Sequence, residues 1–323
     1  MNHFSKKICS LLCMFTLALA TMPAGAYDAT SSNRTMNDIE NDMILYLAEH
    51  HPDISYGTTE YVEYLTSILV ENSDEILSHR SDYDDICTYA GEYLTYVDNM
   101  QVEASNEGEI LSLDKEIGDK TVSQVKEEAA EQAKVDRQKS EEQSYTPIAY
   151  SSSYNRTAAV NYAKKWAKQR NSSFNTYTSD CTNFASQVLN AGGISMRKPS
   201  TIPSGTNSTT KYWYSRKRTV ASQGGVYSKF DVSTSWINVS GFYSYTSNHG
   251  ARIISCSSKN SLQNTARIGD IVQLQNSSGT WYHTIIITGG SKGNYTYCGH
   301  TTNRLNYPVS SIGNNNKFRI IRY

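Results

Sequence analysis

The chain has 323 residues, and its 30 Lys and Arg nearly balance its 31 Asp and Glu. The balance hides an asymmetry: residues 27–150 carry 8 basic and 28 acidic side chains, whereas residues 151–323 carry 20 basic and 3 acidic ones. Six cysteines in a chain of this length exclude a disulfide-rich scaffold. The net of +17 in the second half favours an anionic polymer or surface as partner and says nothing about fold.

Residues 1–26 have the pattern of an export signal. Lys6 and Lys7 precede an apolar run over residues 8–20, and Ala24-Gly25-Ala26 offers a small-residue cleavage site. The run is too short to span a membrane comfortably and no later segment is long enough, so we expect no stable membrane anchor. We therefore expect a secreted, extracellular protein, with the cell wall as one destination.

Cleavage after the signal would leave four cysteines, Cys87, Cys181, Cys256 and Cys298. If Cys181 stays free, three remain and at most one internal bridge can form. Cys256 with Cys298 is a candidate pair that the sequence does not settle.

Residues 27–118 are expected to form an acidic, mainly helical domain. Apolar residues recur at helical spacing over 36–49 and 61–77. Residues 97–113 have strand-like stretches around Asn106-Glu107-Gly108, which predicts a hairpin. Residues 119–150 are expected to form a charged helical linker, because few apolar residues interrupt the charges up to Gln143.

Residues 151–323 are expected to form a basic domain of the α+β class. Asn155 is a candidate N-cap for a helix to about Gln169, and the residues from Cys181 to Leu189 have helical spacing that stops at Gly192-Gly193. Residues 199–235 are interpreted as a loop-rich stretch. Short strands are predicted over 270–275, 283–288, 295–300 and 317–323, and two helices before a small antiparallel sheet define the class.

Cys181 and His283 are the candidate nucleophile and base. Ser179 or Asp180 can cap the helix, which places Cys181 in the first turn, where free N–H groups and the helix dipole favour a thiolate. His283 begins an apolar strand about 100 residues later. A histidine beside a cysteine can accept its proton, and the backbone N–H of Cys181 is a natural oxyanion donor.

His300 is the candidate for the third catalytic position. If the hairpin is symmetric about residues 289–294, Thr288 lies opposite Tyr295 and His283 lies opposite His300 on one face of the sheet. His300 could then bond the second ring nitrogen of His283 and hold its tautomer. Asn303 is the alternative for this role.

Five segments together resemble a known family: Tyr154-Asn155-Arg156, Asp180-Cys181-Thr182-Asn183-Phe184, Gly192-Gly193-Ile194, Gly269-Asp270-Ile271 and His283. They are similar to the Putative amidase domain of secreted Gram-positive proteins, a family related to the NlpC and CHAP cell-wall cysteine peptidases. The resemblance covers residues 151–323. It implies a papain-like fold, with Cys181 as nucleophile and His283 as base, and hydrolysis of amide bonds, with peptidoglycan peptides as the substrate. His300-Thr301-Thr302-Asn303-Arg304 resembles the family's closing segment.

Two other functions remain open at this point. A wall-binding or adhesion module would keep the fold without chemistry, and an acyl-transferring enzyme would cross-link instead of hydrolysing. We expect no cofactor. A zinc site of Cys181, His283, Cys298 and His300 is disfavoured because no Cys-x-x-Cys pair is present.

The expected partner is peptidoglycan or another anionic wall polymer. Tyr212-Trp213-Tyr214 beside Arg216-Lys217-Arg218 could stack bases and meet phosphates, but export makes nucleic acid a poor candidate. The aromatic residues could equally pack under a long loop. The charge asymmetry also predicts a contact between the acidic and basic halves, through which the first restrains the second.

Overall fold

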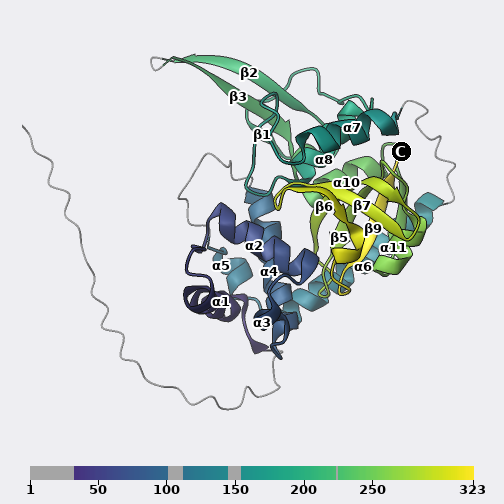
Figure 1. Ribbon diagram of the computed structural model, residues 1–323. Coiled ribbons are helices and arrows are strands. Elements are labelled where there is room, and N and C mark those ends of the chain that lie inside the picture. Colours follow the sequence, from purple (N-terminus) through teal and green to yellow (C-terminus); the bar gives the residue numbers. More distant parts are fainter. Residues whose placement is uncertain (1–32, 101–111, 145–153, 223–224) are drawn as a thin grey trace, which may run out of the picture. The chain divides into compact units, whose positions relative to one another are not determined.

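The computed structural model describes residues 33–100, 112–144, 154–222 and 225–323 (Figure 1). The described residues belong to one compact unit that runs from Ser31 to Tyr323. The export signal expected at 1–26 and the domain boundary expected near residue 150 lie outside the described residues. Within the described part of the chain, no helix is long and apolar enough to cross a membrane.

The acidic region is helical where it is described. Its helices are α1 (Met36–His50), α2 (Thr59–Glu71), α3 (Glu75–Ser78), α4 (Tyr83–Met100), α5 (Lys115–Gly118) and α6 (Val122–Ser144). The helix predicted over 36–49 is confirmed. The helix predicted over 61–77 is confirmed as far as Glu71 but is not continuous. The chain turns at Asn72, whose φ is 50°, and Asp74 then caps α3 by accepting from the Leu77 amide at 2.8 Å.

The predicted hairpin over 97–113 is wrong at its start. Residues 97–100 continue α4, because Val97 extends the buried face that Ala90, Tyr93 and Leu94 form earlier in the helix. Residues 101–111, with the expected turn, lie outside the described residues. Residues 122–144 form the predicted charged helix α6, in which Val122 and Val125 are buried.

The second half of the chain is built on a six-stranded antiparallel sheet. Its strands are β4 (Arg252–Cys256), β5 (Ile271–Gln275), β6 (Trp281–Ser291), β7 (Asn294–Gly299), β8 (Arg304–Pro308) and β9 (Lys317–Arg322), in the order β4-β9-β5-β6-β7-β8. Its helices are α7 (Arg156–Trp166), α8 (Cys181–Ala191), α9 (Thr234–Ile237), α10 (Val239–Ser247) and α11 (Lys259–Thr265), with a 3-10 turn at Val309–Ser311. The α+β class and the four predicted strands are confirmed; β4 and β8 were not predicted.

The stretch interpreted as a loop forms a second sheet instead. It contains β1 (Thr206–Asn207), β2 (Ser215–Ser222) and β3 (Gly225–Ser233), in the order β1-β3-β2 (Figure 1). Trp213 and Tyr214 are buried, as the packing alternative expected, and therefore form no exposed stacking platform. Arg216 and Arg218 both pair with the buried carboxylate of Asp231, which also reduces the basic run that the sequence displays.

Both faces of the six-stranded sheet are covered. Successive side chains alternate between two hydrophobic clusters: Ile285 and Ile287 join the cluster that contains the N-terminal helices, whereas Ile286 joins the cluster that contains α7 and α8. Strands buried on both faces read as continuous apolar runs, which explains the sequence of β6. The acidic helices therefore share a hydrophobic core with the sheet.

The register between β6 and β7 differs from the prediction. Ile286 pairs with Cys298 and Gly290 with Tyr295, because both strands continue into the expected loop and turn at Lys292-Gly293. The predicted pairing of Thr288 with Tyr295 is wrong, and the inference that placed His300 opposite His283 loses its basis. Cys256 and Cys298 are free and lie in different hydrophobic clusters, so they form no bridge.

Candidate active site

Cys181 is the first residue of α8, where the sequence placed it. Asp180 occupies the N-cap position but makes no capping bond with its side chain. The Cys181 side chain has no exposed surface, and its sulfur lies 3.7 Å from Oγ1 of Thr182. Thr182 Oγ1 is in turn 3.0 Å from Oγ1 of Thr284 on β6. Cys181, the candidate nucleophile, thus lies next to β6. The contact is at Thr284, the residue that follows His283 in this strand.

The sulfur is a buried thiol, which corrects the expectation of a thiolate. Burial, with a smaller contribution from the negative charge of Asp98, raises the pKa of Cys181 to about 12, against the lowering effect of hydrogen bonds from the Thr182 side chain and the Thr284 backbone. A position in the first helical turn favours the thiolate by a smaller amount than complete desolvation disfavours it. The cysteine is therefore protonated in this state.

His283 is also buried, and its ring lies on the other side of β6 from the side chain of Thr284. A Cβ on Gly299 would lie 3.8 Å from Nε2 of His283 and 3.5 Å from Ile285, which places the ring on the Ile285 face. Burial, with a smaller contribution from Arg304, lowers the pKa of His283 to about 3. Among the residues that the structure describes, none is shown hydrogen-bonded to this ring, and the lowered pKa keeps the ring neutral and a weak base in this state.

His300 makes contacts that differ from those predicted for it. Its Nδ1 lies 2.6 Å from Oδ2 of Asp180, its Nε2 lies 2.9 Å from the carbonyl oxygen of Trp166, and its ring stacks on Phe184 at 3.8 Å. Both ring nitrogens are occupied, so His300 does not orient His283 here. Asn303, the alternative, accepts a hydrogen bond from Arg170 at 2.8 Å and does not reach His283 either.

Asp180 and His300 instead hold the start of α8 in place. Asp180 is fully buried, and its Oδ1 accepts from the Tyr177 amide and from Asn183. Its Oδ2 faces His300 and lies 3.0 Å from Nε of Arg170. A buried carboxylate with this many donors fixes the residue that precedes Cys181 and so positions the sulfur.

A buried polar chain leads away from the nucleophile and was not predicted. Gln273 on β5 donates to Oγ1 of Thr284 at 3.4 Å and to the carbonyl of Val239 at 2.9 Å, and its own oxygen accepts from Nε of Arg319 at 2.7 Å. The signal in the sequence was a glutamine inside an otherwise apolar strand. Without the fold, nothing connected that glutamine to Cys181.

The C-terminal end of α4 lies against the start of α8 and was also not predicted. Oδ2 of Asp98 accepts from the Val239 amide at 2.8 Å, and Oδ1 is 3.5 Å from the Ser179 hydroxyl. Asn238 donates to the Asp98 carbonyl and to Oδ1 of Asn99, both at 2.9 Å. Burial raises the pKa of Asp98 to about 7, against the lowering effect of the hydrogen bonds from the Val239 amide and the Ser179 hydroxyl.

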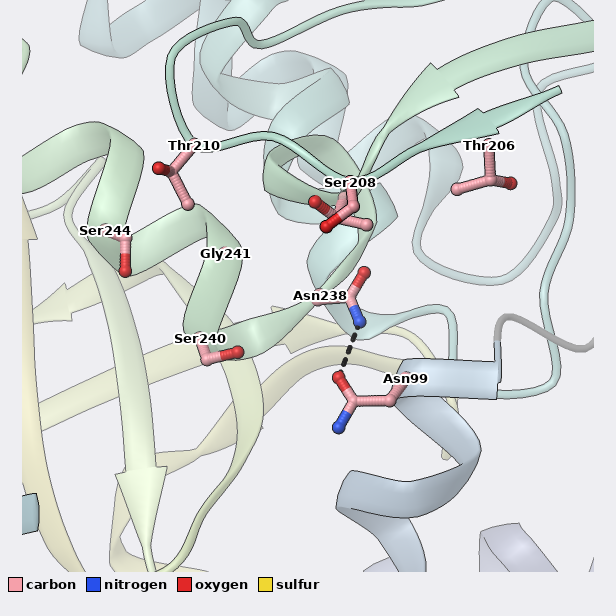
Figure 2. Close-up of a pocket in the computed structure, with 9 residues that line it drawn as sticks. Asn99, Thr206, Ser208, Thr210, Asn238, Ser240, Gly241 and Ser244 are labelled. Carbon is pink, nitrogen blue, oxygen red and sulfur yellow. Dashed lines mark hydrogen bonds between the residues drawn. The ribbon is translucent and has the colours of Figure 1, made fainter. Parts of the chain in front are cut away.

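A pocket of about 450 Å³ adjoins this contact (Figure 2). Its lining contains hydroxyl, amide and glycine residues and no charged or aromatic ones: Asn99, Thr206, Ser208, Thr210, Thr234, Asn238, Ser240, Gly241 and Ser244. Figure 2 shows Asn99 and Asn238 facing one another at one wall, with Ser240 and Ser244 on α10. Such a lining suits an uncharged ligand rich in hydroxyl and amide groups.

The described residues contain no group of three His, Cys, Asp or Glu side chains arranged to hold a metal ion. Cys181 and Cys298, two of the four residues considered as zinc ligands, contact hydroxyl groups instead, those of Thr182 and Thr288. The positions that carry this site are therefore Cys181, the strand with His283, and the end of α4.

Comparisons with known proteins agree with the region that holds this site. Residues 153–323 match the family model described as Putative amidase domain. Two curated relatives are the uncharacterized proteins YhbB and YjcM of Bacillus subtilis (strain 168). YhbB is 30% identical over 144 residues, covering 44% of this chain and 39% of the relative. YjcM is 27% identical over 164 residues, covering 48% of this chain and 32% of the relative.

The chain therefore spans less than half the length of either relative. No solved structure matches this chain. The family model covers slightly more than half of the chain and includes the helix of Cys181, the strand of His283 and the segment of His300. This chain belongs to the Putative amidase domain family.

Proposed function

We propose that this protein is a secreted cysteine amidase that hydrolyses amide bonds in the peptides of the Gram-positive cell wall. The observation that carries the proposal is the placement of Cys181 at the first position of α8, against β6, the strand that contains His283, within the family's matched region. In the reaction, the Cys181 thiolate attacks the amide carbonyl. In this state the His283 ring lies on the face of β6 opposite the Thr284 side chain, so the proposed reaction requires the ring to move toward the sulfur. His283 then takes the thiol proton, gives it to the leaving amine and activates water to release the acyl group.

The surface charge supports an anionic wall polymer as the partner. The three carboxylate side chains of residues 151–323 are Asp180, Asp231 and Asp270, and all three are fully buried beside arginines. Five of the 20 Lys and Arg of this region pair with these three carboxylates, and Arg304 pairs with Glu71 of α2, so the region keeps an excess of positive charge. Binding to an anionic polymer through such charges weakens as salt is raised.

The pocket beside Asn238 supports a substrate with a large uncharged polar part. Its volume of about 450 Å³ lies within the usual range of ligand pockets, and its lining offers hydroxyl and amide groups of the kind that sugars and peptide backbones bond. Ser244→Trp should fill the pocket. We expect it to raise KM for wall fragments with little change in kcat, because the pocket binds ground state and transition state alike.

The direct test is mass analysis of fragments released from purified Gram-positive walls by the full chain, beside Cys181→Ala. We expect new amine and carboxylate ends from the wild type and none from Cys181→Ala, and the fragment masses would identify the bond. New amide bonds in the products would instead identify an acyl transferase.

The burial of Cys181 favours one second candidate, a wall-binding module without chemistry. That candidate predicts equal wall binding by the wild type and Cys181→Ala and no released fragments from either. Release by both proteins would contradict Cys181 as the nucleophile and leave amide hydrolysis to another residue.

A further inference from the structure

The two candidate catalytic side chains are closed off from solvent. Cys181 has 0% of its surface exposed and His283 has 2%. A nucleophile that attacks an amide in a wall polymer must be reached by a large substrate, so the closed state seen here has to open before the wild type can react. Something in the described chain covers the sulfur and has to move.

The end of α4, in the acidic half of the chain, contacts a residue that lies two positions before Cys181. Asp98 has 5% of its surface exposed, and its carboxylate is bonded to the Val239 amide and lies at the hydroxyl of Ser179, two residues before Cys181. Asn238 adds two hydrogen bonds to the same helix end, one to the Asp98 carbonyl and one to Asn99. We call Asp98 and Asn99, with these contacts, the α4 plug.

The rest of α4 is fixed to the sheet, so the plug is held in place by its own helix. Asn276, in the turn between β5 and β6, donates to the Cys87 carbonyl of α4 at 2.9 Å, and Thr280 donates to Glu92 at 2.7 Å. Tyr93, Leu94 and Val97 belong to the same hydrophobic cluster as Leu274 and Ile285 of the sheet. Opening therefore requires only residues 98–100 of α4 to leave, while the helix up to Val97 stays packed on the sheet.

The plug acts on the sulfur electrically as well as sterically. The charge of Asp98 is the largest influence after burial that raises the pKa of Cys181. Cys181 is the titratable group that faces Asp98 from α8, while Ser179, Asn238 and the Val239 amide are uncharged. Removing the carboxylate would let water reach the sulfur and would remove a like charge from a developing thiolate.

We propose that the α4 plug is an autoinhibitory contact, in which Asp98 seals Cys181 from substrate and holds it as a thiol until the end of α4 is displaced. The inference rests on the proposed function in one respect, that Cys181 is the nucleophile to be restrained. Glu71 with Arg304, and the apolar cluster, keep the N-terminal helices attached throughout. The restraint is thus local to the site and needs no separation of the two halves.

The test measures alkylation of each cysteine by iodoacetamide in the full chain, followed by peptide mass mapping. The variants are Asp98→Ala, which removes the carboxylate and its hydrogen bonds, and Asp98→Asn, which removes the charge and one of the two acceptor oxygens. Asp53→Ala is the matched control, because Asp53 is an exposed acid on the same half of the chain. Cys87, Cys256 and Cys298 are buried and free, so they report any general loosening.

We expect Cys181 to react at least about tenfold faster in Asp98→Ala, since one unit in its pKa alone changes the thiolate fraction tenfold. Asp98→Asn should lie between Asp98→Ala and the wild type, and the other three cysteines and Asp53→Ala should be unchanged. Equal rates at Cys181 in all proteins would overturn the proposal. Equal acceleration at all four cysteines would do so too, because Asp98 would then be a structural residue only.

A second variant covers the case in which Asp98→Ala does not fold. Asn238→Ala removes two hydrogen bonds to the plug and leaves Asp98 in place, and it should also expose Cys181 selectively; no selective exposure would overturn the proposal. The readout does not depend on wall hydrolysis. If Cys181 is exposed selectively but no wall fragments are released, the α4 plug proposal stands and the amidase proposal is rejected. If wall fragments are released but Cys181 is not exposed selectively, the amidase proposal stands and the α4 plug proposal is rejected.

Discussion

At the scale of single residues, His300 has a different role from the one that the sequence predicted. The sequence predicted that His300 orients His283, whereas its two ring nitrogens contact Asp180 and the Trp166 carbonyl. It is a positioning residue for α8, and its effect on Cys181 passes through Asp180. The sequence therefore showed residue types that can form a catalytic triad, but it did not show that His300 contacts Asp180 and not His283.

Replacing His300 by Ala should destabilise the protein by about 3 kcal/mol, because the buried Asp180 loses one partner and Phe184 loses a stacked ring. Urea unfolding measures this loss. The pKa values in the pH profile of kcat/KM should not move, since His300 does not contact the reacting groups. A shifted profile with unchanged stability would show that His300 is catalytic after all.

Asp98 predicts a dependence of stability on pH. Its pKa is raised to about 7 in the folded protein, above the 3.9 of a free aspartate, so its stabilising contribution is complete below about pH 4 and is lost as pH rises through 7. Asp98→Asn cannot ionise. Relative to this variant, the wild type should lose up to about 1.4 kcal/mol per pH unit between pH 4 and 7.

Urea unfolding of both proteins at pH 5 and pH 8 measures this difference. The comparison of the two proteins removes the contributions of all other titrating groups. Parallel stability curves for the wild type and Asp98→Asn would contradict a buried Asp98 carboxylate.

At the scale of elements, the helices and strands with a strong apolar periodicity were predicted correctly. Each element that was missed has a local cause. The Cys181 helix and the strands at 271–275 and 281–291 were predicted, because a buried face gives them a clear apolar pattern. The β2–β3 hairpin was missed because residues 225–229 are all exposed and the apolar Val226 and Tyr227 are adjacent, so no alternation marks a half-buried strand. The β6–β7 register was missed because Gly289 and Gly290 suggested a loop but belong to the strand.

The contact between α4 and the β5–β6 turn makes a prediction at this scale. A Cβ on Gly91 would lie 2.2 Å from Nδ2 of Asn276 and 3.4 Å from Cβ of Thr280. Gly91→Ala should force Asn276 from its bond to Cys87 and destabilise the protein by about 1–3 kcal/mol, despite the better helix propensity of alanine.

Thermal unfolding and Cys181 alkylation of Gly91→Ala test this packing together. We expect a lower Tm and a faster reaction at Cys181, because a shifted α4 seats its end less well. A Tm equal to or above that of the wild type would show that α4 does not pack closely on this turn.

At the scale of the whole molecule, the charge asymmetry led to a prediction about binding partners, but it did not predict how the two halves of the chain pack together. The sequence divided the chain into an acidic and a basic half, and the structure joins them through one hydrophobic cluster that includes Tyr89, Tyr93, Tyr282 and Ile285. Composition could not show this, because the apolar residues that meet lie about 190 residues apart in the sequence. The α4 plug depends on the same packing. The sequence therefore gave no reason to single out Asp98 among the 28 acidic residues of residues 27–150.

Residues 151–323 alone should therefore not fold stably, although they contain both candidate catalytic residues. Without the N-terminal helices, Val272, Leu274, Ile285, Ile287 and Ile320 would lose the cover of one sheet face. We expect this fragment to aggregate or to lack a cooperative unfolding transition, as measured by light scattering and tryptophan fluorescence. A monomeric fragment with a cooperative transition would contradict the shared core.

The measurement that tests the account most directly is acid-quenched peptide mass analysis of Asp98→Asn protein mixed with purified wall fragments. The variant removes the charge of Asp98 beside Cys181, which should weaken the α4 plug, and keeps the proposed chemistry. We predict a substrate acyl group on the Cys181 peptide early in the reaction, absent from Asp98→Asn carrying Cys181→Ala. Hydrolysis that continues in the double variant, or an acyl group on another residue, would contradict Cys181 as the nucleophile.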